Sequence, residues 1–192
     1  MRFFSGLILV TAAIAKVAFG VLPDAPLPGY GVEPVQWAVE VAPGQTELFN
    51  GTVQQVHEKI VQINPQFKLN PQPRGSLSRE LSQSRDNVIC LGTAGFQDAW
   101  SDGVKYLRNI PGSPANGPGP GSCGRVSCSD NSAIWWCNDN TAPLVLESFG
   151  RIADAAEAIL KVCFVEGHGL FHIPGQSFQP ENWNTMLQWA SC

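Results

Sequence analysis

The 192-residue sequence lacks several patterns that would mark a class of function. Its 12 Lys and Arg residues are fewer than its 16 Asp and Glu residues, so nucleic acids and anionic membrane surfaces are poor partners. No apolar run after the first 20 residues is long enough to cross a bilayer. Neither GxSxG nor HExxH occurs, and nothing marks one of the three histidines as part of a catalytic triad. These absences argue against membrane insertion and against an enzyme.

Residues 1–20 have the features of a secretory signal peptide. Arg2 supplies the positive start, an apolar stretch spans 3–15, and Ala18-Phe19-Gly20 has the small residues that signal peptidase accepts. A membrane anchor is disfavoured because Lys16 interrupts the apolar region and prolines follow it. We therefore expect cleavage before Val21 and a secreted, extracellular protein. Residues 1–20 contain two bases and no acid, so the mature chain has 10 bases, 16 acids and a net charge of −6.

The cysteines are confined to the second half of the chain. Their even number and the oxidising compartment predict three disulfides, with fifteen pairings open. A zinc site is the alternative, but Cys123-x4-Cys128 and Cys128-x8-Cys137 lack the close pairing of zinc-binding motifs. We expect no metal and no cofactor. The six residues are Cys90, Cys123, Cys128, Cys137, Cys163 and Cys192.

Residues 21–66 are predicted to form an N-terminal arm with a hairpin and a helix. Apolar residues alternate with others over 35–41, which predicts a strand, and 47–49 suit the returning strand. Residues 67–87 are polar and rich in Pro and Ser, which is typical of a linker. A helix is expected between them, because a capping box precedes apolar residues at helical spacing: Thr52, Gln55, Val53, Val56 and Ile60.

Asn50-Gly51-Thr52 is a sequon for N-linked glycosylation. In a secreted chain it predicts a glycan on Asn50. The alternative is an unused match, in which Thr52 serves only as the helix cap.

Residues 88–192 are predicted to form a cysteine-rich domain. Strand and helix signals follow one another in the order strand, helix, strand, strand, helix, strand. We expect an α+β fold, a small disulfide-stapled two-layer sandwich whose antiparallel sheet carries two helices on one face. Residues 112–122 are almost all Gly, Pro, Ser and Asn, so we expect a loop there. The predicted elements are strands at 88–91, 124–128, 132–137 and 183–189, a helix over 96–110, and a second helix capped by Ser148 and ending at Cys163, with an apolar segment at 170–173 before the last strand.

Trp135 and Trp136 are the most informative candidates for binding. Neighbours on a strand point to opposite faces, so when one packs in the core the other turns outward. An exposed indole near the polar residues Asn138, Asp139 and Asn140 would suit stacking on a sugar ring or anchoring a partner protein. The alternative, which we favour, is that a helix or the N-terminal arm covers it.

Two weaker patterns concern catalysis and metal binding. His168 and His172 are spaced as metal ligands on a helix would be, but glycines flank His168 and argue against a helix. Four aspartates could supply the paired carboxylates of a carbohydrate-active hydrolase, although helix starts and turns already account for them. They are Asp98, Asp102, Asp130 and Asp139.

The run from Cys123 to Asn140, CGRVSCSDNSAIWWCNDN, resembles the signature of small secreted cysteine-rich proteins of filamentous ascomycete fungi. Pro118-Gly-Pro-Gly121, Gly175-Gln-x-Phe178 and Asn182-Trp-Asn184 are similar to that group as well. The resemblance implies an effector-like protein with a killer-toxin-like α/β fold. It would act outside the cell by binding a host or competitor protein or a cell-wall glycan, and it brings no catalytic residues with it. A hydrolase and a structural cell-wall protein are the alternatives, and the oligomeric state stays open.

Overall fold

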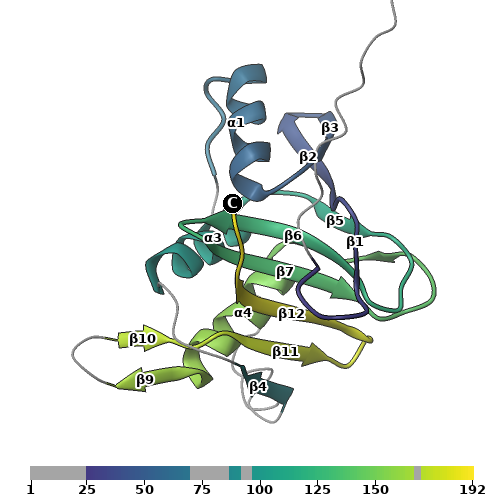
Figure 1. The fold of residues 1–192 in the computed structure, drawn as a ribbon. Helices are drawn as coiled ribbons and strands as arrows, with labels where there is room; N and C mark the ends of the chain where they lie inside the picture. The colour runs from purple at the N-terminus through teal and green to yellow at the C-terminus, as the bar shows by residue number, and fades with distance from the viewer. Residues whose placement is uncertain (1–24, 70–86, 92–96, 167–169) are drawn as a thin grey trace, which may run out of the picture.

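The computed structural model describes residues 25–69, 87–91, 97–166 and 170–192 (Figure 1). This part of the chain is an α+β structure with three helices and three sheets of six, four and two strands. No helix in it is both long enough and apolar enough to span a membrane. The predicted signal peptide, His168 and all but a few residues of the predicted linker lie outside the described residues.

The largest sheet, sheet A, takes five of its six strands from the cysteine-rich half of the chain and β1 from the N-terminal arm. Its strands are antiparallel except at one edge, where β1 runs parallel to β6. β6 and β7 form a hairpin, as the sequence predicted, because Asp130 and Asn131 adopt the positive φ values of 47° and 56° that a two-residue turn needs. In spatial order the strands are β1 (Gly31–Val32), β6 (Ser122–Ser129), β7 (Ser132–Asn138), β12 (Trp183–Trp189), β11 (Gly175–Gln179) and β4 (Val88–Cys90).

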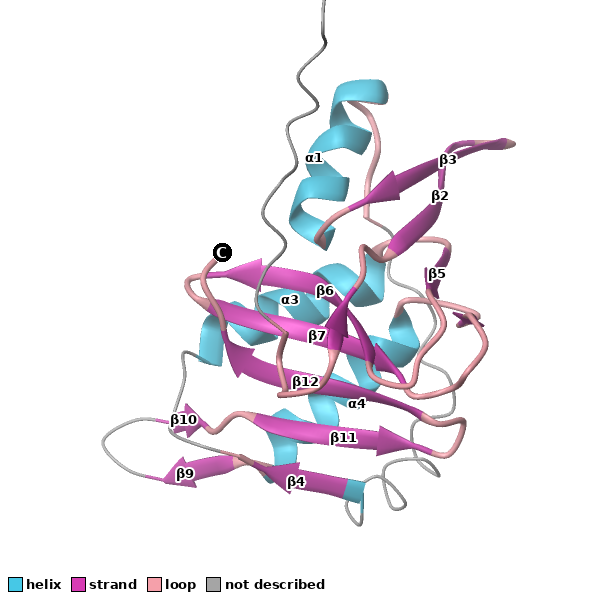
Figure 2. Ribbon diagram, turned by 45° about the vertical axis from the view of Figure 1, so that its right-hand side comes forward, coloured by secondary structure: helices cyan, strands magenta, loops and turns pink. Residues whose placement is uncertain are grey.

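Two helices pack on one face of sheet A (Figure 2). Helix α3 (Gln97–Asn109) contacts β6 and β7, and α4 (Gly150–Val162) contacts β11 and β12. Helix α3 lies close to β7: a Cβ atom on Gly103 would come within 2.9 Å of Ile134 Cδ1. The cap residue of α4 is Phe149, so the predicted Ser148 cap is wrong by one position. Buried side chains between the layers include Trp100, Leu107, Ile134, Trp136, Ile152, Ile159, Trp183 and Leu187.

The N-terminal part joins the same core. It consists of the hairpin β2 (Gln36–Ala42) and β3 (Gln45–Asn50) and helix α1 (Val53–Ile63). Trp37 of β2 stacks on Phe149 at 4.2 Å between ring centroids, and its indole N–H donates to the Gly51 carbonyl at 2.8 Å. Buried residues of both halves of the chain therefore form one hydrophobic cluster.

Sheet B contradicts one prediction. Its strand order is β3-β2-β5-β8, where β5 is Ser113–Asn116 and β8 is Leu144–Val145. Residues 113–116 were predicted to be loop from their composition, which was wrong, because β2 and β8 supply hydrogen-bonding partners on both sides. The remaining pair, β9 (Phe164–Glu166) and β10 (Leu170–His172), forms a small hairpin after α4.

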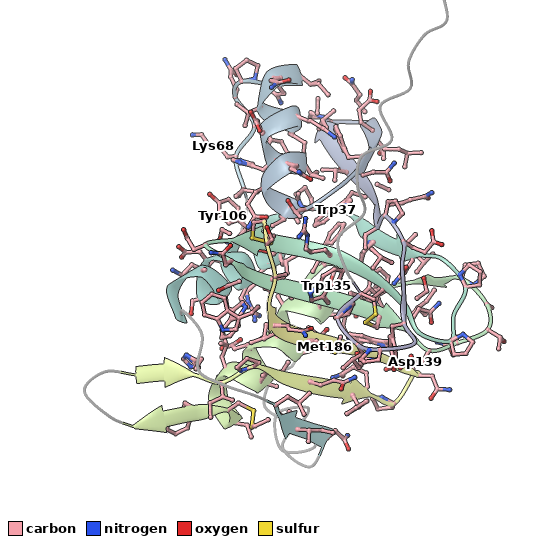
Figure 3. The ribbon with its side chains drawn as sticks, viewed as in Figure 1. Trp37, Lys68, Tyr106, Trp135, Asp139 and Met186 are labelled. Atoms are coloured by element: carbon pink, nitrogen blue, oxygen red, sulfur yellow. A yellow bond between two sulfur atoms is a disulfide. The ribbon has the colours of Figure 1, made fainter. Side chains whose placement is uncertain are left out.

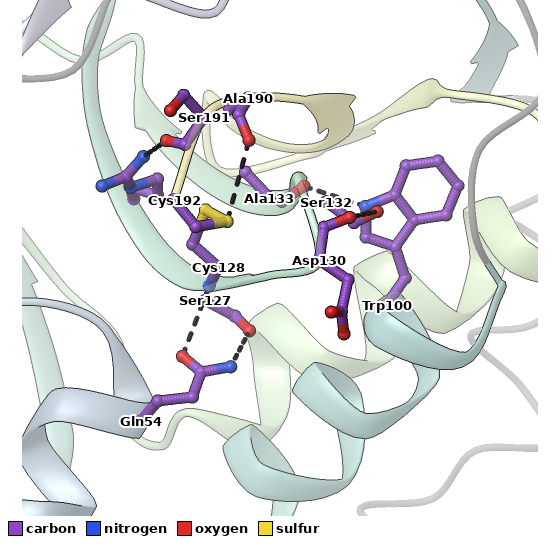
Figure 4. The surroundings of a disulfide bond; sticks show 11 residues. Gln54, Trp100, Ser127, Cys128, Asp130, Ser132, Ala133, Ala190, Ser191 and Cys192 are labelled. Carbon is purple, nitrogen blue, oxygen red and sulfur yellow. Dashed lines mark hydrogen bonds between the residues drawn. A yellow bond between two sulfur atoms is a disulfide. The ribbon is translucent and has the colours of Figure 1, made fainter.

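The prediction of three disulfides is confirmed. Cys90–Cys163 ties β4 to the end of α4, Cys123–Cys137 links β6 to β7, and Cys128–Cys192 holds the C-terminus on β6. Around the last bond, Gln54 of α1 donates to Ser127 Oγ at 2.8 Å and accepts from the Cys128 N–H at 3.3 Å (Figure 4). Three disulfides fit an oxidising, extracellular compartment.

Candidate functional site

Trp135 and Trp136 point to opposite faces of β7, but neither indole is exposed. Trp136 is 0% exposed and lies in the core between sheet A and the helices. Trp135 is 1% exposed and lies on the other face, which we call the open face of sheet A, beside Met186 (Figure 3). Residues of the N-terminal arm pack against the buried cluster that contains Trp135, namely Leu27, Tyr30 and Val32. The structure thus shows the covering by the N-terminal arm that we favoured over an exposed tryptophan.

Asn138 joins three stretches of backbone. Its Nδ2 donates to the carbonyls of Gly117 at 2.8 Å and Ala142 at 2.9 Å. Its Oδ1 accepts from the Asn140 N–H at 2.9 Å and from Asn140 Nδ2 at 3.0 Å. Asn140 Nδ2 also donates to the carbonyls of Glu181 and Asn182. Both amides, predicted as binding residues, therefore hold loops together.

Asp139 fixes the N-terminal arm to the sheet. Its carboxylate accepts from the Gly121 N–H at 3.2 Å and from Asn184 Nδ2 at 2.7 Å. The Tyr30 hydroxyl lies beside it, and burial together with this carboxylate raises the pKa of Tyr30. The Tyr30 ring also packs on Gly121, where a Cβ would come within 3.3 Å of the ring. Asp139 thus has a structural role in positioning the arm.

The remaining part of the open face is formed by β11 and β4. Cys90 and Gly175 are paired neighbours on β4 and β11 and face α4, since Cys90 is bonded to Cys163 and a Cβ on Gly175 would lie 2.6 Å from Ile159 Cγ2. Side chains an odd number of positions away on either strand therefore point to the open face. Two of them are apolar and exposed, Ile89 at 50% and Phe178 at 37%, whereas Gln176, which pairs with Ile89, is buried. Leu91, directly after β4, is apolar and 40% exposed. We call Ile89, Leu91 and Phe178 the apolar patch.

Sequence reasoning missed the apolar patch. Residues 88–91 were predicted as a strand with no statement of which side chains are exposed, and β11 was not predicted at all. One signal could have found it: a cysteine bonded to the helix layer must point inward, which turns its two neighbours outward. That signal required the disulfide pairing, which the sequence left open.

Asp130 and Asp139 are not brought together as a catalytic pair, whereas Asp98 and Asp102 lie one turn apart on α3. Asp130 and Asp139 lie beyond opposite ends of the seven-residue strand β7, roughly 20 Å apart or more, whereas glycosidase carboxylates lie about 5–9.5 Å apart. Asp102 is exposed and pairs with Lys105 at 2.7 Å. The Asp98 side chain lies outside the described part of the structure.

His172, the second predicted metal-ligand candidate, is buried in β10. Its side chain is 8% exposed, and burial lowers the pKa of the imidazole. Its Nδ1 atom has no hydrogen-bond partner in the described part of the chain. No group of three potential metal ligands occurs among those residues either.

No protein-family model, curated protein or solved structure matches this chain. The structure itself defines the class: an α+β protein held by three disulfides, with one face of its main sheet partly covered by an N-terminal arm.

Proposed function

We propose that this protein is a secreted, effector-like or toxin-like protein that binds a host or cell-wall component through the apolar patch. The observation that carries the proposal is that Ile89 of β4 and Phe178 of β11 lie on the open face of two adjacent strands, with Leu91 directly after β4, and that each is more than a third exposed. Single exposed apolar residues are common on proteins. Here Ile89 pairs with Gln176, two positions before Phe178 on β11, and this closeness of two exposed apolar side chains supports an interaction site.

The patch lies at the edge of sheet A, where β4 pairs with β11 and has no second partner among the described strands. An edge strand offers unpaired backbone groups beside its side chains, so a partner can use both. The phenyl ring of Phe178 adds a flat apolar surface that suits a sugar face or an apolar anchor of a protein. These features support binding without a chemical step.

The disulfides suit this role outside the cell. Cys90–Cys163 spans 73 residues and fastens β4, which carries Ile89, to the end of α4. Pre-organising a small edge strand lowers the entropy that binding would otherwise lose. We regard the fold as a two-layer sandwich in which α3 and α4 back the sheet and leave the other face for ligands.

A binding assay with matched variants tests the proposal. The secreted protein, purified from culture fluid, would be incubated with isolated host cell walls and with host extracellular proteins. We expect Ile89→Ser/Phe178→Ser to reduce retention at least tenfold, and Leu48→Ser, which removes an exposed apolar side chain from sheet B, to have no effect. Unchanged retention of the double variant, or turnover of a wall polysaccharide by the purified protein, would contradict the proposal.

A further inference from the structure

Leu48 is the most exposed large apolar side chain in the described part of the protein, at 76%. It lies in β3, the outer strand of sheet B, which pairs only with β2 among the described strands. An exposed apolar residue on an unpaired sheet edge invites association with other chains, and proteins usually cover or charge such edges. Something attached nearby could cover it.

Asn50 projects from the same face of β3 as Leu48. The intervening Phe49 points into the core and is 9% exposed, so residues 48 and 50 both point outward. The Cα atoms of residues two positions apart on a strand are about 6.5 Å apart. A single sugar ring attached to Asn50 can therefore reach the Leu48 side chain. The Asn50 side chain is exposed and begins the sequon Asn50-Gly51-Thr52.

We propose that Asn50 carries an N-linked glycan whose first N-acetylglucosamine packs on Leu48 and covers the outer edge of β3. In the transfer, Asn50 Nδ2 loses a proton and bonds to C1 of the sugar. The lipid diphosphate that carried the oligosaccharide leaves with the electrons of the broken C1–O bond. The inference depends on the proposed function only in requiring secretion, since the donor is a lipid-linked oligosaccharide of the secretory pathway.

The order of events follows from Thr52. In the folded protein Thr52 is 6% exposed and forms a capping box with Gln55, whose Oε1 accepts from the Thr52 N–H at 3.0 Å. The Gly51 carbonyl accepts from the Trp37 indole. The sequon is therefore locked after folding, and its threonine side chain is buried. The glycan must be added before α1 forms, so the folded, unmodified protein is not a substrate.

The first experiment measures occupancy by intact mass after expression in a eukaryotic secretory host, with and without an enzyme that removes N-glycans. We expect a glycan on the wild type and on Thr52→Ser, and none on Asn50→Gln or Thr52→Asn. Asn is a good N-cap residue, so Thr52→Asn removes the sequon while keeping the helix cap. An unmodified Asn50 in the secreted wild type would overturn the proposal.

The second experiment tests the contact with Leu48. Urea midpoints would be compared for glycosylated and enzymatically deglycosylated protein, in the wild type and in Leu48→Ser. We expect deglycosylation to lower the midpoint of the wild type, and to change that of Leu48→Ser by less than half as much. An equal change in both would overturn the packing on Leu48. Retention on host walls should be the same with and without the glycan, so a failure of the binding proposal is visible separately.

Discussion

Replacing Asn138 with Ala separates a structural role from a binding role. Asn138 is 0% exposed and makes four hydrogen bonds, two donated and two accepted. A net contribution of about 1 kcal/mol for each bond gives a loss near 4 kcal/mol of unfolding free energy. The Gly117 and Ala142 carbonyls lie in loops, so water can partly replace the lost hydrogen bonds in Asn138→Ala. We therefore expect the unfolding free energy to fall by roughly 3 kcal/mol.

Urea unfolding with the disulfides intact measures this loss. With a denaturant slope of about 2 kcal/mol per molar, the midpoint should fall by roughly 1.5 M. Asn138→Asp should be equally harmful despite its similar size, because a carboxylate oxygen would then face the two carbonyls that accept from Nδ2. Asn140→Ala is the matched control and should cost about 1 kcal/mol, because its bonds to Glu181 and Asn182 are exposed.

One result would refute the structural reading of Asn138. If Asn138→Ala shifts the midpoint by less than about 0.3 M, well below the shift expected from the bonds, and also abolishes retention on host walls, then Asn138 is a binding residue. The role suggested by the sequence would then be right, and the apolar patch would not suffice as the binding surface.

Three further predictions follow from the packing, the disulfides and the titration of a buried group. Cys90→Ser/Cys163→Ser opens a loop of 73 residues, which should lower the unfolding free energy by about 4 kcal/mol and reduce wall retention; a melting temperature equal to the wild type would contradict this. Gly124→Ala places a Cβ against the Val35 side chain and should destabilise by about 1–3 kcal/mol in urea unfolding, whereas Gly117→Ala, with no atom nearer than 3.9 Å, should cost less. Burial lowers the pKa of His172, so near and below pH 6.5, roughly the unfolded value, the unfolded chain binds more protons than the folded one. Stability should therefore fall as pH drops from about 7.5 to 5; His172→Phe should show a smaller fall, and equal falls would count against the burial argument.

Several elements were predictable because their signals are local. The alternation around Trp37 predicted β2, and the capping box of Thr52 and Gln55 predicted the start of α1. Asp130 and Asn131 accept the left-handed backbone of a two-residue turn, which predicted the β6–β7 hairpin. In each case the element forms because of residues that are close together in the sequence.

Other elements were not predictable because their reason lies far along the chain. β5 contains Pro114 and no apolar alternation, and it is a strand because β2 pairs with it. β11 begins at Gly175, which must lack a side chain because α4 approaches closely. A strand is recognised in a sequence by apolar residues at every second position, and neither β5 nor β11 has this pattern.

The tryptophan pair shows how this limit affects the search for a site. Alternation correctly placed Trp135 and Trp136 on opposite faces, but exposure depends on what crosses the face. Leu27, Tyr30 and Val32 cross it, about 100 residues earlier in the chain, and they cover the part built by β6, β7 and β12. The next strands, β11 and β4, present Phe178 and Ile89 to solvent. The arm therefore decides where on the open face a ligand can bind, so a search for partners should begin at the apolar patch, away from the tryptophans.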